Sequence, residues 1–310
     1  MRILFMGTPD FAAEILTAMA DSELDICGVI SQPDKPKGRG HKMVMTDVKK
    51  AAMECGYEVY QPETLRNGAI EELLEELQPE LIVVAAYGKF LPEYVLNYPK
   101  YGCINVHASI LPKYRGAAPI QWSVVNGDEE TGITIQKMAK GMDTGDIISI
   151  QTTTIGEYET SEELFDRLAK IGGELLLKTI SDIENGTATY TPQNEDEATY
   201  APMIDKSMAE IDWTKSSAEI SKLICGMNSW PLAWTYYNGE ILKIVTAEKC
   251  SGKGESGEIL GIEKGRGMIV AAGEGAICVK IAQFPNSKKM SVEDYARGHE
   301  IKIGTILGGN

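Results

Sequence analysis

An asparagine and a histidine stand two positions apart in INVHASILPKYRG, residues 104–116, where an apolar run ends. Because side chains alternate between the two faces of a β-strand, Asn105 and His107 would point to the same face. The amide of Asn105 could stabilise an oxyanion, and the imidazole of His107 could exchange a proton near neutral pH. The spacing also fits a second interpretation, in which a backbone carbonyl satisfies the histidine and the asparagine closes a turn.

A carboxylate that could serve the same site is Asp143, in the segment KGMDTGDII, residues 140–148. This segment follows the predicted strand GITIQKM, so we expect its loop at the same edge of the sheet. Gly141 and Gly145 would allow that loop unusual turns. An aspartate beside His107 would orient the imidazole and stabilise its charged form. The alternative is an aspartate in a solvated turn.

Other catalytic centres are less well supported by the sequence. Ser109 lacks the GxSxG turn of a serine hydrolase, and the chain has three histidines with no HExxH motif, so we expect no metal site. The first strand ends in GTPDF rather than GxGxxG, which disfavours a nicotinamide dehydrogenase. The six cysteines form no CxxC pair and are expected to be reduced thiols.

The loop QPDKPKGRGHKM, residues 32–43, is the most basic stretch in an acidic half of the chain. Its composition fits either a solvated surface loop or an arm that meets phosphates or the end of a nucleic acid. The net charge of −15 argues against general affinity for nucleic acids, and we expect no DNA partner. Residues 206–310 are nearly neutral, so a polyanion would have to be met locally.

The elements that must position these residues alternate between strand and helix in the first part of the chain. Apolar runs at 2–7, 24–31, 81–87 and 103–108 read as strands of a buried parallel sheet. We therefore expect an α/β fold with a Rossmann-like, doubly wound and mostly parallel sheet over residues 1–186. Residues 187–204 are expected to be an interdomain linker, and 205–310 a smaller OB-like β-barrel with an Asn238-Gly239 hairpin.

The first residues pass directly into a strand pattern, and no apolar run approaches the roughly 20 residues that span a bilayer. We therefore expect a cytoplasmic protein with no membrane partner.

Over nearly its whole length, the sequence resembles the methionyl-tRNA formyltransferases, which are folate-dependent formyltransferases. The motifs that carry the resemblance are FMGTPDFA, QPDKPKGRG, VAAYGKFLP, INVHASILPKYRGAAPIQW, TGITIQKMAKGMDTGDI, IDW and NSWP. The chain departs from the family at Ile110, where the motif Asn-x-His-x-Ser-Leu-Leu-Pro has leucine. A second departure is His299, which follows Gly298 where the family often has arginine.

The resemblance implies that Asn105, His107 and Asp143 form the catalytic group. The formyl donor would be 10-formyltetrahydrofolate, a co-substrate, and the acceptor would be the α-amino group of initiator methionyl-tRNA. Residues expected to line the folate site are Ala86, Tyr87, Gly88, Leu91, Ser109, Ile110, Leu111 and Pro112. Residues expected to contact the tRNA are Lys35, Lys37, Arg39 and Lys42, together with the C-terminal barrel.

Two other functions stay open on the sequence. A formyltransferase that acts on a sugar nucleotide or a purine precursor would share Asn105, His107 and Asp143 but would not need the barrel or the basic loop. An RNA-binding protein with a catalytically idle first domain would not need all three residues.

Overall fold

The computed structural model describes residues 1–37 and 42–308. The chain divides into two compact units, which are described separately. Unit 1 comprises residues 1–119, 131–153 and 165–201, and unit 2 comprises residues 120–130, 154–164 and 202–310.

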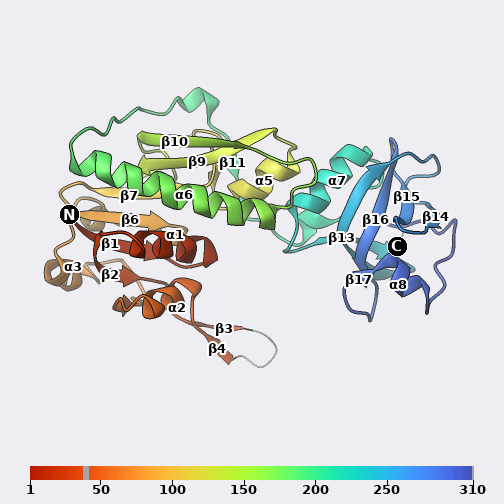
Figure 1. Cartoon of the computed structure of the whole chain (residues 1–310), viewed down its shortest axis with the longest axis horizontal. Helices are drawn as coiled ribbons and strands as arrows, with labels where there is room; N and C mark the ends of the chain where they lie inside the picture. The colour runs from red at the N-terminus through yellow and green to blue at the C-terminus, as the bar shows by residue number, and fades with distance from the viewer. Residues whose placement is uncertain (38–41, 309–310) are drawn as a thin grey trace. The chain divides into compact units, whose positions relative to one another are not determined.

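Unit 1 is built on a sheet with strand order β10-β9-β7-β6-β1-β2-β5 (Figure 1). Strands β5, β2, β1, β6 and β7 pair in parallel, and β9 pairs antiparallel with β7. The order turns back between β1 and β6, and ligands of such sheets bind at the carboxyl ends of the strands near that point. The strand bounds are β1 Arg2–Gly7, β2 Asp25–Ile30, β5 Val59–Tyr60, β6 Leu81–Ala85, β7 Cys103–His107, β9 Glu130–Lys137 and β10 Ile147–Thr154.

Helices cover both faces of this sheet, which explains why its central strands are apolar throughout. One face packs against α3 (Glu71–Leu77) and α4 (Glu93–Leu96), in a cluster that includes Cys103 of β7. The other face lies against α1 (Asp10–Ala20) and α6 (Ser161–Glu184) (Figure 1). Helix α2 (Asp47–Glu54) begins with Thr46 as its side-chain cap. Cys103 of β7 faces α4. Alternation along the strand therefore puts Asn105 and His107 on that same face, closer to the carboxyl end of β7.

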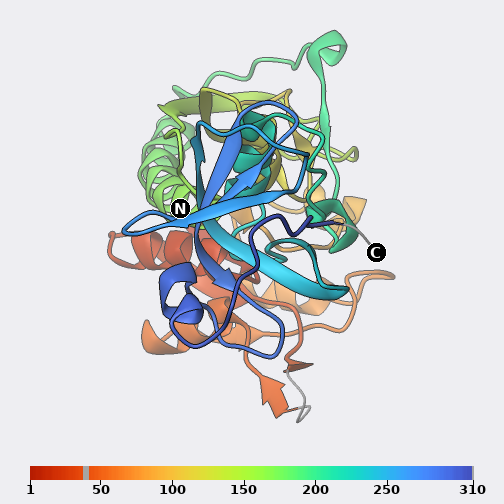
Figure 2. The ribbon, with the colours of Figure 1, turned by 90° about the vertical axis from the view of Figure 1, so that its right-hand side faces the viewer.

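Unit 2 contains an antiparallel sheet, which faces the viewer in cyan to blue in Figure 2. Its strand order is β12-β13-β16-β15-β14, and β17 pairs with β16. The expected hairpin is present, because Asn238 and Gly239 both have positive φ between β12 and β13. The strands are β12 Ala233–Tyr237, β13 Glu240–Cys250, β14 Ile259–Glu263, β15 Gly267–Ala271, β16 Ala276–Gln283 and β17 Met290–Ser291; the helices are α5 Pro119–Val125, which begins in unit 1, α7 Ser217–Gly226, η2 Ser207–Ala209 and α8 Val292–Ala296. The fold class expected from the sequence, an α/β unit followed by a smaller β unit, is confirmed.

Two segments expected to be irregular contain short strands. In the basic loop, β3 (Lys35–Lys37) pairs antiparallel with β4 (Lys42–Val44). In the segment expected to be a linker, η1 (Glu195–Glu197) is followed by β11 (Tyr200–Ala201), which pairs in parallel with β8 (Arg115–Gly116). Within the segment expected to be a linker, residues 187–201 belong to unit 1 and residues 202–204 to unit 2. The domain limits 1–186 and 205–310 stay predictions.

The described parts of the chain contain no helix with the length and apolar character of a membrane span. In the same residues the six cysteines are all free thiols.

Candidate active site

Strands β7 and β9 present four polar side chains to one face of the sheet. Asn105 of β7 lies directly opposite Gln136 of β9, and His107 lies opposite Thr134. Directly opposed residues of an antiparallel pair share a face. His107, Thr134 and Gln136 are buried, whereas Asn105 is half-buried and keeps access to solvent. The sheet thus supplies an amide and an imidazole at a partly open surface.

Asp143 joins this group, although by a different route from the one expected. Because β9 runs antiparallel to β7, the loop after β9 leaves at the opposite end of β7, and the expected shared edge is wrong. The loop doubles back at once: the amide of Lys137 donates to the carbonyl of Asp146 at 2.8 Å. It thereby returns Asp143 over the face that carries Asn105 and His107.

Two short hydrogen bonds and one long contact surround the carboxylate of Asp143. The amide of Gly116 donates to Oδ2 at 2.9 Å, and Nε2 of Gln136 donates to Oδ1 at 2.8 Å. Nδ2 of Asn105 makes a long contact of 3.4 Å with Oδ1. Asp143 itself has a φ of +53°, a conformation that aspartate adopts more readily than most residues.

The imidazole of His107 is fixed by a backbone carbonyl. Its Nε2 lies 2.9 Å from the carbonyl oxygen of Tyr114, and a carbonyl can only accept, so Nε2 carries a proton. Nδ1 lies 3.7 Å from Oδ1 of Asp143, beyond hydrogen-bond distance but close enough for attraction between charges. Nδ1 is therefore the ring nitrogen that faces the carboxylate and can exchange a proton. The contact with a backbone carbonyl expected for this histidine is present, and its functional role stays a prediction.

The turn after β7 is held in place by its neighbours on the sheet. Thr134 donates from its hydroxyl to the carbonyl of Ser109 at 2.7 Å and accepts from the amide of Leu111 at 3.1 Å. The Ser109 hydroxyl donates to the carbonyl of Lys113 at 2.6 Å. Gly116 has a φ of +120° and lies so close to Ala201 that a Cβ would be 2.7 Å from its carbonyl oxygen. The backbone around the candidate site is thus fixed by polar contacts.

The residues expected to bind folate differ in their accessibility. Those with exposed or half-buried positions are Ala86, Gly88, Ile110 and Pro112, whereas Tyr87, Leu91, Ser109 and Leu111 are buried. The loops after β6 and β7 leave the same sheet edge, because these strands are parallel neighbours. The turn at 86–88 uses positive φ at Ala86 (+42°) and Gly88 (+78°). Its exposed backbone could contact a ligand, but the Tyr87 ring packs in the core below.

The Tyr87 side chain gives a first prediction. Its hydroxyl is buried and has no hydrogen-bond partner among the residues that the structure describes. Tyr87→Phe is therefore expected to raise the free energy of unfolding at pH 7 by about 1 kcal/mol, since it removes an unsatisfied polar group. Thermal and urea unfolding of the two proteins would measure this, with the exposed Tyr98→Phe as a matched control.

The same comparison has a pH dependence. Burial raises the pKa of the Tyr87 hydroxyl to about 12, whereas tyrosine in an unfolded chain titrates near 10. As the pH rises, the unfolded wild-type chain loses this proton before the folded protein does. The free energy of unfolding of the wild type therefore falls between about pH 10 and about pH 12, by up to about 3 kcal/mol. Tyr87→Phe lacks this loss. An advantage of the variant that disappears above pH 10 would contradict the assignment.

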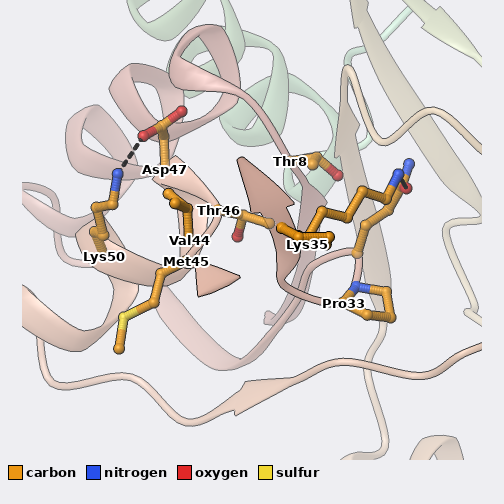
Figure 3. Close-up of a pocket in the computed structure, with 10 residues that line it drawn as sticks. Thr8, Pro33, Lys35, Val44, Met45, Thr46, Asp47 and Lys50 are labelled. Atoms are coloured by element: carbon orange, nitrogen blue, oxygen red, sulfur yellow. Dashed lines mark hydrogen bonds and ion pairs between the residues drawn. The ribbon is translucent and has the colours of Figure 1, made fainter. Parts of the chain in front are cut away.

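Three of the residues expected to contact tRNA, Lys35, Lys37 and Lys42, lie in the hairpin β3–β4. Arg39 lies outside the described residues, and of Lys37 and Lys42 only the strand positions are described. Lys35 donates to Oε1 of Gln32 at 3.1 Å. A cavity of about 220 Å³ opens at the root of this hairpin (Figure 3), lined by Thr8, Gln32, Pro33, Lys35, Pro36, Val44, Met45, Thr46, Asp47 and Lys50.

The Gln32 side chain connects this cavity to the expected folate turn. Its Nε2 donates to the carbonyl of Tyr87 at 2.7 Å, and the Thr8 hydroxyl donates to the same carbonyl at 3.1 Å. The charge of Lys50 is met by Asp47 at 2.7 Å (Figure 3). The Gln32 side chain therefore links Lys35 of the basic hairpin to the turn after β6.

Residues that sequence reasoning missed surround Asp143. Gln136 belongs to the predicted strand GITIQKM, where polar residues alternate with isoleucines. These polar residues lie on the face that carries Asn105 and His107. Arg115 is wholly buried and pairs with Glu195 at 2.8 Å, which lowers the pKa of that carboxyl and raises the pKa of the arginine. Gln193 lies in the segment that was expected to be a linker.

Among the residues described, no group of three His, Cys, Asp or Glu side chains could hold a metal ion.

Solved structures share this fold at low sequence identity. HypX from Aquifex aeolicus, solved in complex with tetrahydrofolic acid, matches with a TM-score of 0.65 and 16% identity over 98% of this chain and 50% of its own. The N-formyltransferase from Helicobacter canadensis, solved in complex with folinic acid and dTDP-3-aminofucose, matches with a TM-score of 0.65 and 20% identity, over 93% of this chain and 99% of its own.

Two family models together match most of the chain, and relatives match 99% of it. A model of the formyl transferases matches residues 1–180, and a model of the formyl transferase C-terminal domain matches residues 203–300. The methionyl-tRNA formyltransferase of Alkaliphilus oremlandii is 46% identical, over 99% of this chain and all of its own. That of Acetivibrio thermocellus is 44% identical over the same shares. With identity of this size along its whole length, the chain belongs to the methionyl-tRNA formyltransferase family.

Proposed function

We propose that this protein transfers the formyl group of 10-formyltetrahydrofolate to the α-amino group of initiator methionyl-tRNA, in the cytoplasm and without a metal ion. The observation that carries the proposal is the convergence of Asn105, His107 and Asp143 on one face of the sheet, at a partly open surface. Membership of the family supports the same conclusion. The chemistry needs one amide, one imidazole and one carboxylate around a carbonyl group, and this site offers them.

The reaction exchanges one carbon–nitrogen bond for another. The amino nitrogen of the methionyl ester attacks the formyl carbon, and a bond from that carbon to the folate nitrogen breaks. The amine loses one proton and the folate nitrogen gains one. Between these steps the formyl oxygen carries negative charge, which Nδ2 of Asn105 and protonated Nδ1 of His107 would stabilise. One such donor typically lowers the barrier by about 2.7–4 kcal/mol.

Asp143 supports the charged imidazole in this scheme. Because Nε2 of His107 donates to the Tyr114 carbonyl, a donor at Nδ1 makes the ring an imidazolium. The carboxylate 3.7 Å away offsets that charge. With a water molecule it also provides the path by which the amine proton reaches the departing nitrogen. Gly116 and Gln136 keep the carboxylate oriented while this happens.

We place the folate beside the turn at 86–88 and the segment from Ser109 to Pro112. The exposed backbone of Ala86 and Gly88 would pair with the edge of the pterin, and Ile110 and Pro112 would contact its face. The buried side chains of Tyr87, Leu91 and Leu111 would support these loops from below. We expect Lys35, Lys37, Arg39 and Lys42 to contact phosphates at the acceptor end of the tRNA. Unit 2 would supply a second contact with the tRNA.

The tRNA contact gives a prediction at Arg39. Arg39→Ala is expected to raise the KM for methionyl-tRNA and to leave the KM for 10-formyltetrahydrofolate unchanged, because a phosphate contact is lost. The plot of log affinity against log salt should become shallower by about one. The exposed Arg66→Ala is the matched control. Affinity for tRNA that does not depend on salt would contradict the phosphate contact.

The proposed function is tested by mixing the purified protein with 10-formyltetrahydrofolate and methionyl initiator tRNA. Formylmethionine attached to the tRNA is the expected product. If the protein instead formylates an amino-sugar nucleotide or a purine precursor, its acceptor is that molecule and not methionyl-tRNA. If it binds the tRNA but consumes no formyl donor, it is an RNA-binding protein and not a formyltransferase.

A further inference from the structure

A strap formed by residues 191–201 connects the two segments that build the candidate site. At one end, Thr191 exchanges two backbone hydrogen bonds with Ile147, at 2.8 and 2.9 Å, shortly after Asp143. At the other end, Tyr200–Ala201 pairs with Arg115–Gly116, and Gly116 donates its amide to Asp143. The strap is therefore attached on both sides of the catalytic carboxylate.

The Gln193 side chain lies between these attachments and binds the loop of Asp143 directly. Its Nε2 donates to the carbonyl oxygens of Asp143 and Gly145, both at 2.7 Å. Its Oε1 accepts from Nε of Arg115 at 3.1 Å and from Nη2 at 2.8 Å. Arginine has only donors, so it must face the amide oxygen, and the amide NH₂ must face the loop. The orientation of Gln193 is thus fixed by chemistry on both sides.

Arg115 holds Gln193 from behind. The guanidinium group is wholly buried and makes two bonds of 2.8 Å with the exposed carboxylate of Glu195 on the same strap. Such a bidentate pair has a fixed geometry as well as charge complementarity. One buried arginine therefore fixes both the strap, through Glu195, and the amide that binds the loop, through Gln193.

We propose that Gln193 is a positioning residue for formyl transfer, which acts through Asp143; this inference rests on the proposed function. Asp143 must keep a left-handed backbone conformation while its carboxylate faces Gly116, Gln136 and His107. The two donors of Gln193 bind the carbonyls of residues 143 and 145 and hold the loop in that conformation. No residue of the strap touches the reacting atoms in this scheme.

Gln193→Glu separates this role from mere attachment of the strap. A glutamate at 193 keeps acceptors for Arg115 but presents oxygens, in place of NH₂ donors, to the carbonyls of Asp143 and Gly145. If Gln193 only anchored the strap, the variant would match the wild type. We expect instead that kcat falls by about 100-fold, as a misplaced catalytic group can cause, with both KM values within roughly threefold of wild type.

The matched control is Glu197→Gln, an exposed residue in the same turn as Glu195, which should keep full activity. On an Asp143→Ala background, Gln193→Glu should cost less than about a further threefold, because two residues that act as a unit are not additive. The proposal would be overturned if the losses of kcat from Asp143→Ala and Gln193→Glu multiplied in the double variant. It would also be overturned if Gln193→Glu alone kept the wild-type kcat. If Gln193→Glu does not fold, Gln193→Met carries the same test.

Amide hydrogen exchange reads the same loop without any activity. Exchange at the Gly116 amide and across residues 141–145 should be faster in Gln193→Glu than in the wild type and unchanged in Glu197→Gln. Equal exchange in all three proteins would overturn the positioning role. A wild-type protein that forms no formylmethionine would refute the proposed function, whereas the exchange measurement would still decide whether Gln193 holds the loop.

Discussion

Asn105→Ala is expected to lower kcat for formyl transfer by about 100- to 1,000-fold, the usual loss when one donor to an oxyanion is removed. The amide of Asn105 has only a long contact of 3.4 Å with Asp143, so it is available to bind a developing charge. Its side chain is half-buried, and its removal should cost little stability. Single-turnover rates with saturating 10-formyltetrahydrofolate and methionyl-tRNA would measure the effect on chemistry alone.

The control for this prediction is Asn97→Ala, an exposed asparagine at the end of α4, which should turn over like the wild type. Near-normal turnover of Asn105→Ala, with the protein shown to be folded, would remove the amide from the chemistry.

Asp143→Ala is expected to lower kcat by orders of magnitude as well, because in the proposed scheme His107 loses the carboxylate that offsets its positive charge.

How far the sequence could predict this site depends on the distance between the residues along the chain. Asn105 and His107 belong to one strand, and alternation alone places them on one face. Gln136 could have been found by the same rule, because Thr134 and Gln136 alternate with buried isoleucines in β9. The fold class followed from apolar runs that alternate with helical patterns. The resemblance supplied the family and favoured the role for Asp143 that its loop had left open.

The rest depended on contacts that no local pattern encodes. The direction of β9 could not be predicted from its own residues, so the argument for placing Asp143 at the carboxyl edge of β7 was wrong even though the carboxylate does reach His107. Likewise, the segment 187–204 has the composition of a linker, yet it carries Gln193 onto the Asp143 loop. Its short pairing with Arg115–Gly116 is too brief to leave a strand period in the sequence.

Gly145→Ala is expected to have the largest effect on stability, about 2–4 kcal/mol lower free energy of unfolding. The loop doubles back so tightly after β9 that a Cβ at Gly145 would overlap the carbonyl oxygen of Lys137. That oxygen is backbone at the end of a strand, so no side-chain rotation relieves the overlap. The loop must move away from the sheet, and its carbonyl bonds with Gln193 must lengthen or break.

Because Asp143 lies in the same loop, kcat should fall together with stability, even at temperatures where the variant stays folded. Urea unfolding and single-turnover rates at 20 °C would measure the two effects separately. Gly261→Ala is the matched control, since a Cβ there meets no atom within 4 Å, and it should be close to wild type in both. A Gly145→Ala protein that keeps wild-type stability and rate would show that this loop does not need its close approach to β9, and that the geometry of the carboxylate is set elsewhere.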